Sequence, residues 1–107
     1  MYRQGDVLIT PIKSIPKGKD KDGTTRKRDS LGRLVILEGE VTGHAHAISE
    51  KNAFVFENGD NDDYLRVQDV PVMLRHEEHS KIELPPGDYK ITRQRQFTAG
   101  EVKYVFD

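Results

Sequence analysis

The segment AFVFENGDNDDYLRVQ, residues 53–68, decides the fold class. Its two ends, AFVFE (53–57) and YLRVQ (64–68), are rich in the β-branched and aromatic residues that strands prefer. The turn residues between them, NGDND (58–62), contain an Asn-Gly pair, which is a strong signal for a β-hairpin. The segment therefore predicts two antiparallel strands joined by a turn.

The sequence on either side continues as short strands separated by turn residues. The expected strands are DVLITPI (6–12), RLVILEG (33–39), PVMLRHEEH (71–79), SKIELPPG (80–87), DYKITRQRQF (88–97) and EVKYVF (101–106). The triplet Pro85-Pro86-Gly87 enforces a further turn, and no stretch shows the apolar spacing of a helix. This pattern predicts an all-β protein, either a small barrel or a two-sheet sandwich.

The composition limits the chemistry that the chain can carry. Its 107 residues fit one domain with a modest core, and 35% of them are hydrophobic. Because there is no cysteine, disulfides, thiolate nucleophiles and iron–sulfur clusters are excluded, and any metal must be held by histidine, carboxylate or water. No apolar run approaches the roughly 20 residues that span a bilayer, and no secretory signal is recognisable. We therefore expect no membrane contact and a cytoplasmic location.

Positive charge is concentrated in one segment. Residues 13–33 carry eight Lys or Arg against three Asp, whereas residues 34–107 carry eight basic and fourteen acidic residues. Within it, residues 16–32 have almost no apolar content, which predicts a long basic loop. The cations of residues 17–28 would suit phosphate groups of a nucleic acid, but interspersed aspartates and the lack of aromatic residues favour a solvated loop.

Two of the four histidines, His44 and His46, flank one alanine in GEVTGHAHAI (39–48). Successive side chains of a strand point to opposite faces, so the two imidazoles would project the same way, about 7 Å apart. Two imidazoles on one face can share a metal ion, although strand histidines are also commonly exposed or hydrogen-bonded. We predict that His44 and His46 belong to a metal-binding pocket.

The other two histidines lie close together in LRHEEHSKIELPPG (74–87). On a regular strand, His76 would share a face with Glu78, and His79 would lie opposite. A bulge or turn at Glu77-Glu78 would instead let both histidines converge, and bulges are common beside functional sites. His76, His79 and Glu78 are thus further candidate ligands, for Zn, Fe, Mn or Ni.

The segment GEVTGHAHAISE (39–50) resembles the first signature of the cupins, which are small metal-binding β-barrels of the jelly-roll type. The resemblance lies in a glycine, His-x-His and a following glutamate, here Gly39, His44, His46 and Glu50. PPG (85–87) is similar to the Pro-x-Gly of the second signature, but Lys90 stands where that signature has a histidine. The resemblance adds Glu50 as a candidate ligand and leaves two alternatives for the missing histidine: His76 or His79 replaces it from the preceding strand, or the site is incomplete and binds no metal.

Two arginines complete the candidate site. Arg93 and Arg95 follow Tyr89 and Ile91 on one face of the strand expected at 88–97, and they could hold a small anion at the rim of the protein. Solvated arginines paired with nearby glutamates are the alternative. We therefore expect a small cupin-like metal-binding protein, either a metal-dependent enzyme that acts on a small anionic substrate or a protein that only binds such a ligand. The competing hypotheses are a non-catalytic module, of bacterial or phage origin, that binds nucleic acid or protein, and a homodimer stabilised by the histidines.

Overall fold

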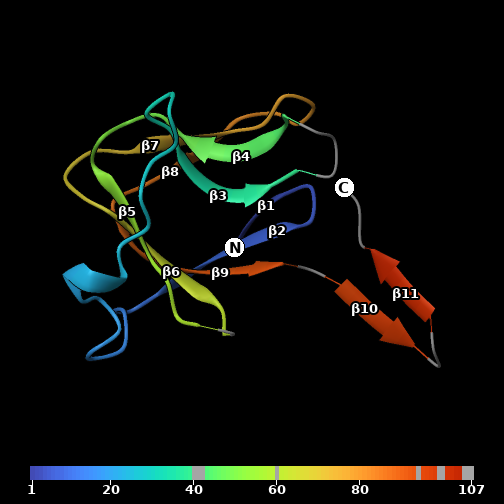
Figure 1. Cartoon of the computed structure of the whole chain (residues 1–107), viewed down its shortest axis with the longest axis horizontal. Helices are drawn as coiled ribbons and strands as arrows, with labels where there is room; N and C mark the ends of the chain where they lie inside the picture. Colours follow the sequence, from blue (N-terminus) through green and yellow to red (C-terminus); the bar gives the residue numbers. More distant parts are fainter. Residues whose placement is uncertain (40–42, 60, 94, 99–100, 105–107) are drawn as a thin grey trace.

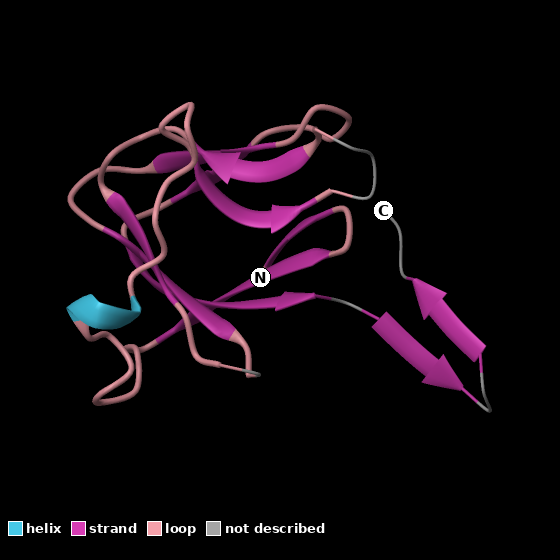
Figure 2. Ribbon diagram, in the orientation of Figure 1, coloured by secondary structure: helices cyan, strands magenta, loops and turns pink. Residues whose placement is uncertain are grey.

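The protein is an all-β chain with two antiparallel sheets that enclose one core (Figure 1; Figure 2). The computed structural model describes residues 1–39, 43–59, 61–93, 95–98 and 101–104, the last two ranges by their backbone alone. The five-stranded sheet has the order β1 (Tyr2–Gln4), β2 (Val7–Ile12), β9 (Gly87–Arg93), β6 (Asp63–Val67), β5 (Ala53–Phe56). The four-stranded sheet has the order β3 (Leu34–Glu38), β4 (Ala45–Ile48), β7 (Val72–Arg75), β8 (Ile82–Leu84).

These sheets confirm the predicted sandwich and exclude the closed barrel for the described strands. The hairpin predicted at 53–68 is formed by β5 and β6, with Phe56 opposite Tyr64. The strand expected at 88–97 is divided between β9 and β10 (Arg95–Thr98), which pairs with β11 (Glu101–Tyr104) in a separate hairpin. Across the described residues, no helix is long and apolar enough to cross a membrane.

Alternating burial places the core between the two sheets. In β9, for example, Tyr89 and Ile91 are buried, whereas Lys90 and Thr92 are partly exposed. The core side chains come from both sheets, and they are Val7, Ile9, Leu34, Ile36, Ile48, Ala53, Val55, Leu65, Val67, Val72, Leu74, Leu84, Tyr89 and Ile91. Strand β4 is buried throughout, and its outward positions, Ala45 and Ala47, line a groove on the outer face of the sheet.

The long loop predicted at 16–32 connects β2 to β3 and contains one short 3-10 helix, η1 (Asp22–Thr24). Two of its arginines hold it against the sandwich. The Arg26 guanidinium donates to the carbonyls of Val35 and Ile36, at the irregular register of β3, and pairs with Asp63. The Arg28 guanidinium donates to the carbonyl oxygens of Gly32, Ile48, Ser49, Glu50 and Ala53. Part of the basic charge therefore serves the fold.

Candidate metal centre

All four histidines meet at one end of the sandwich. His44 immediately precedes β4 and His46 lies within it, while His76 and His79 follow the end of β7. Strands β4 and β7 are antiparallel neighbours, with Ala47 opposite Arg75, so the start of β4 meets the end of β7. The ring of His76 is central: its centroid lies 5.8 Å from that of His44, 4.3 Å from that of His46 and 4.7 Å from that of His79.

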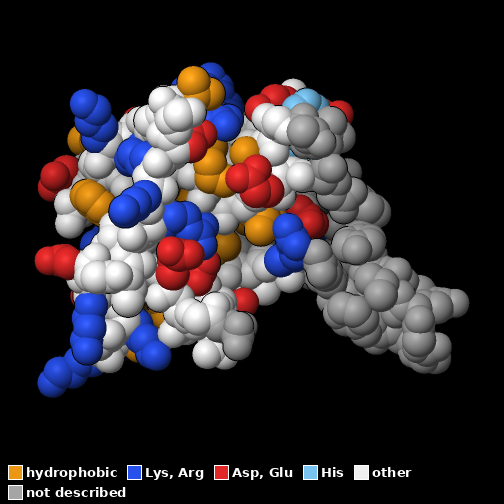
Figure 3. Space-filling model, viewed as in Figure 1, with side chains coloured by type: hydrophobic (Ala, Val, Ile, Leu, Met, Phe, Trp, Pro, Cys, Tyr) orange, Lys and Arg blue, Asp and Glu red, His pale blue; other side chains and the backbone are white. Residues whose placement is uncertain are grey.

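The convergence of His76 and His79 depends on a bend. Strand β7 ends at Arg75, and residues 77–79 form a bend before β8 begins. A regular strand would have pointed His76 and His79 to opposite faces. The turn considered from the sequence is therefore present, and it places both rings in one cluster (Figure 3, where histidine atoms are exposed between acidic side chains).

The potential donor atoms of three side chains lie close enough together to hold a metal ion. One ligand atom each from His44, His76 and Glu77 lies within 4.8 Å of the others. The Glu77 carboxylate is held in place by the Ala45 backbone N–H, which donates to Oε1 at 2.9 Å. That hydrogen bond, with the charges of nearby groups, holds the pKa of Glu77 below its usual value, so the group is an anion at neutral pH.

The donors of this set are not saturated by hydrogen bonds. His44 Nδ1 is buried without a hydrogen-bond partner in the described chain, and the nearest carboxylate oxygen recorded for it, Glu78 Oε2, is 3.8 Å away. His76 Nδ1 accepts a hydrogen bond from the Glu78 backbone N–H at 3.0 Å. A metal ion at His76 would therefore either replace this N–H at Nδ1 or require the ring to change tautomer. A buried ring nitrogen without a hydrogen-bond partner is expected of a histidine that binds a metal ion.

His46 is oriented by a buried glutamine. Gln4 Nε2 donates to the carbonyls of Leu74 and Ser80, both at 2.9 Å, so Gln4 Oε1 faces His46 Nδ1, also at 2.9 Å. Because Oε1 can only accept, His46 Nδ1 must carry the proton, and Nε2 keeps its lone pair. Metal-binding histidines are commonly oriented in this way by a second partner. Burial, with repulsion from His76, lowers the pKa of His46 to about 4, which keeps the ring neutral.

The two residues after Gln4 complete the wall of the cluster. Gly5 and Asp6 form the tight turn between β1 and β2, and Gly5 has a φ of 59°. A Cβ at Gly5 would lie 2.8 Å from His79 Nε2 and 3.3 Å from His46 Cε1, so only glycine allows the rings to approach this backbone. Asp6 places Oδ1 3.7 Å from His46 Nε2. The segment QGD (4–6) is thus part of the site.

Some predicted site residues lie elsewhere. Glu50 follows the opposite end of β4 from His44, and its Oε2 accepts a hydrogen bond from the Met73 N–H at 3.2 Å. Lys90, which was not a predicted ligand but stands where the second signature has a histidine, lies on the outer face of β9, near Asp62. Glu78 approaches His44 but is mostly exposed, and the neighbouring Glu77 is the carboxylate in the donor set.

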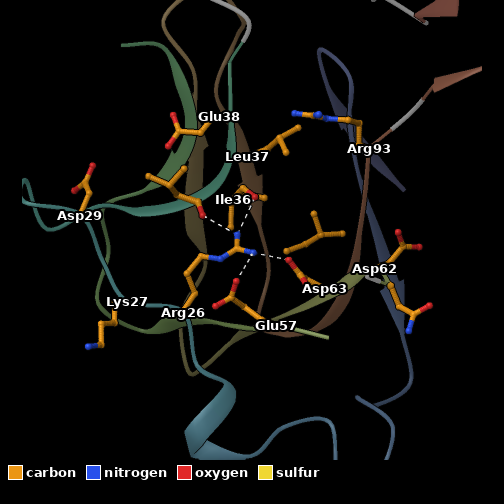
Figure 4. A pocket seen from close by; sticks show the side chains of 13 residues that line it. Arg26, Lys27, Asp29, Ile36, Leu37, Glu38, Glu57, Asp62, Asp63 and Arg93 are labelled. Carbon is orange, nitrogen blue, oxygen red and sulfur yellow. Dashed lines mark hydrogen bonds and ion pairs between the residues drawn. The ribbon is translucent and has the colours of Figure 1, made fainter. Parts of the chain in front are cut away.

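Of the two predicted anion-binding arginines, only Arg93 has a side chain within the described residues. Arg93 lies 3.7 Å from Asp6, at the rim of a pocket of about 540 Å³ (Figure 4). That pocket is a poor anion site, because its lining contains five carboxylates and its central cation, Arg26, is taken up by internal contacts. The side chain of Arg95 lies outside the described residues.

Sequence reasoning missed Gln4, Gly5, Asp6 and Glu77. Gly5-Asp6 is a recognisable turn pair between two strands, but nothing local indicates that this turn meets the histidines. The choice between Glu77 and Glu78 depends on the shape of the bend, which strand alternation alone cannot supply.

These features define a two-sheet β-sandwich that carries a histidine and carboxylate cluster at one end. Residues 3–94 match the family model described as "Domain of unknown function (DUF8820)", which spans most of the chain, and the protein therefore belongs to that family. No curated protein and no solved structure matches the chain.

Proposed function

We propose that this protein binds one divalent transition metal ion through His44, His76 and Glu77, beside His46 and His79. The observation that carries the proposal is the set of three donor atoms within 4.8 Å of one another, one residue of which has a buried, unpaired ring nitrogen. Two nitrogens and one carboxylate oxygen suit Zn, Fe, Mn or Ni. Such a set leaves a coordination position for water or a small anionic ligand.

The surroundings favour metal binding over isolated structural histidines. Four imidazoles in contact would repel one another if protonated, and burial with that repulsion lowers the pKa of both His46 and His76. The neutral rings keep lone pairs, and Gln4 directs the lone pair of His46 toward Asp6 and the cluster. A nearby carboxylate anion, Glu77, supplies the negative charge that a cation requires.

Elemental analysis of untagged protein tests the proposal. After dialysis against Zn, Ni, Mn or, without oxygen, Fe(II), we expect about one ion per chain for one of these metals. The variants His76→Ala and Glu77→Gln should lose it, whereas Glu83→Gln, which changes an exposed carboxylate on β8, should retain it. Circular dichroism would verify that each variant is folded.

Absence of metal in the wild-type protein, or equal loading of the His76→Ala variant, would reject the proposal. The non-catalytic interaction module would then be the leading explanation. Its nucleic-acid form has less support, because Arg26 and Arg28 of the basic loop are engaged with backbone carbonyls.

A further inference from the structure

We propose that a groove beside the metal centre binds a small dicarboxylate, with one carboxylate on Arg75 and Arg33 and the other at the metal. This inference rests on the proposed function, because it names the class of ligand that the same site would take. The groove has a volume of about 280 Å³, which is small for a ligand pocket. It is lined by Arg33, Ala45, Ala47, Ser49, Arg75, His76 and Glu77.

The groove is continuous with the candidate metal centre. His76 and Glu77 belong both to its lining and to the set of metal donors. A ligand in the groove would therefore reach the coordination position that the protein donors leave open. The groove is also lined by Arg33 and Arg75, so it offers cationic groups for a second carboxylate beside the metal donors.

The sheet register places the two arginines on either side of β4. Arg75 is opposite Ala47 across the β4–β7 pair, and Arg33 directly precedes β3, which pairs with the other edge of β4. Neighbouring strands are about 4.8 Å apart, so β3 and β7 are separated by roughly 10 Å. The alanines between them leave space above the sheet, and their methyl groups would contact the carbon chain of a ligand.

The two arginines differ in how they are held. Arg33 is oriented by Asp29, whose Oδ2 accepts from Arg33 Nε at 2.9 Å, and its Nη1 lies 3.9 Å from Glu77 Oε2. Arg75 is exposed, and its guanidinium makes no hydrogen bond or ion pair with the described part of the chain. A guanidinium that is not engaged by the fold is available for bidentate binding of a carboxylate.

A dicarboxylate fits these features better than an ion with a single charged group. Its two carboxylates can occupy the arginine end and the metal end together, while its apolar chain covers Ala45 and Ala47. Each carboxylate then replaces its water contacts by charge-assisted contacts, as a buried or partly buried anion requires.

Calorimetric titration with succinate tests the inference. We expect succinate to bind more tightly to the protein loaded with whichever of Zn²⁺, Ni²⁺, Mn²⁺ or Fe²⁺ it takes up than to the metal-free protein. Succinamate, which lacks one negative charge, should bind the loaded protein about tenfold more weakly or worse. Arg75→Gln should weaken succinate binding at least about tenfold in both forms, while Lys81→Gln, which removes an exposed positive charge from the adjacent loop, should leave it unchanged.

Metal content is measured on the same samples, so the two proposals can fail separately. A loaded protein that binds succinate no better than succinamate, or equally well after Arg75→Gln, overturns the dicarboxylate groove and leaves metal binding intact. A chain that takes up no metal overturns the proposed function, and with it the metal end of the groove. Equal effects of Arg75→Gln and Lys81→Gln would show only general charge attraction and would also overturn the inference.

Discussion

Gly5 links backbone conformation to the histidine cluster. Its φ of 59° is a conformation that residues with a Cβ rarely adopt, and its missing side chain leaves room for the rings of His79 and His46. Gly5 is therefore needed both for the turn between β1 and β2 and for the close approach of the imidazole rings to the backbone. Gly59 has a similar φ of 62° but no atom within 4 Å of the position that a Cβ would take. A substitution at Gly59 therefore measures the backbone cost without the steric contact.

We expect Gly5→Ala to be more destabilising than Gly59→Ala. Both variants carry the backbone cost of a left-handed conformation, but only Gly5→Ala forces the imidazoles to move. The additional loss in free energy of unfolding should be about 1–3 kcal/mol, measured by urea denaturation. Metal affinity should fall for Gly5→Ala alone. Equal losses in the two variants would show that the cluster is not packed against this turn.

Strand β9 is secured at its start by a charged network. Asp88 accepts hydrogen bonds from Arg66 Nε at 2.9 Å, on the adjacent β6, and from the Ile15 N–H at 3.1 Å, in the loop after β2. Arg66 also packs over the ring of Phe56 in β5. The Asp88 carboxylate thus connects β9 to β6 and to the segment that follows β2.

This network makes stability depend on pH. Burial alone would raise the pKa of Asp88, but the hydrogen bonds from Arg66 and Ile15 outweigh it and lower the pKa below the usual 3.8. The unfolded chain therefore takes up the proton more readily. Asp88 contributes stability above pH 3.8 and loses this contribution as the pH falls through the lower pKa of the folded state.

Asp88→Asn should lower the free energy of unfolding by about 1–3 kcal/mol at neutral pH. The variant should also lose less stability than the wild-type protein between about pH 5 and pH 2, because it has no carboxylate to protonate at this position. Asp22→Asn, at an exposed position of η1, serves as the control. If the stability of the wild-type protein and of Asp88→Asn changed with pH in parallel, Asp88 would not be a source of the pH dependence.

Across the whole molecule, the histidine cluster joins the two sheets. His44, His46 and His76 come from the four-stranded sheet and its loops, whereas Gln4, Gly5 and Asp6 belong to the edge of the five-stranded sheet. The core between the sheets consists mainly of Val, Leu and Ile, with no tryptophan in the chain. A metal ion at this end would add a cross-link that the unfolded chain lacks.

We expect the bound metal to raise the melting temperature. A ligand at 100 times its dissociation constant stabilises the folded state by about 2.7 kcal/mol, which corresponds to roughly 10 °C or more for a chain of this size. EDTA should reverse the shift, and Mg²⁺, which prefers oxygen ligands, should not produce it. A scanning-calorimetry comparison with His76→Ala checks that the shift belongs to this cluster. Equal shifts in both proteins would assign it to another site.

Local patterns predicted much of the fold. The Asn-Gly turn and its flanking apolar residues indicated β5 and β6, and the alternation in residues 88–93 matches the burial of Tyr89 and Ile91. The barrel and the sandwich could not be distinguished, because both bury one face of each strand with the same alternation. The four candidate histidines were found from their spacing, but Glu50 was placed among them by resemblance and lies beyond the far end of β4.

The sequence by itself determined most of the strands and turns and identified the four histidines as candidate ligands, because these follow from residue type and spacing along the chain. Only the tertiary structure decided that Gln4 fixes the tautomer of His46, that Gly5 admits two rings, and that Glu77 supplies the carboxylate. It also decided that Arg33 and Arg75 flank a groove next to these donors. These contacts join segments that are far apart in the chain. Their geometry depends on strand pairing and loop shape, which local sequence patterns do not predict.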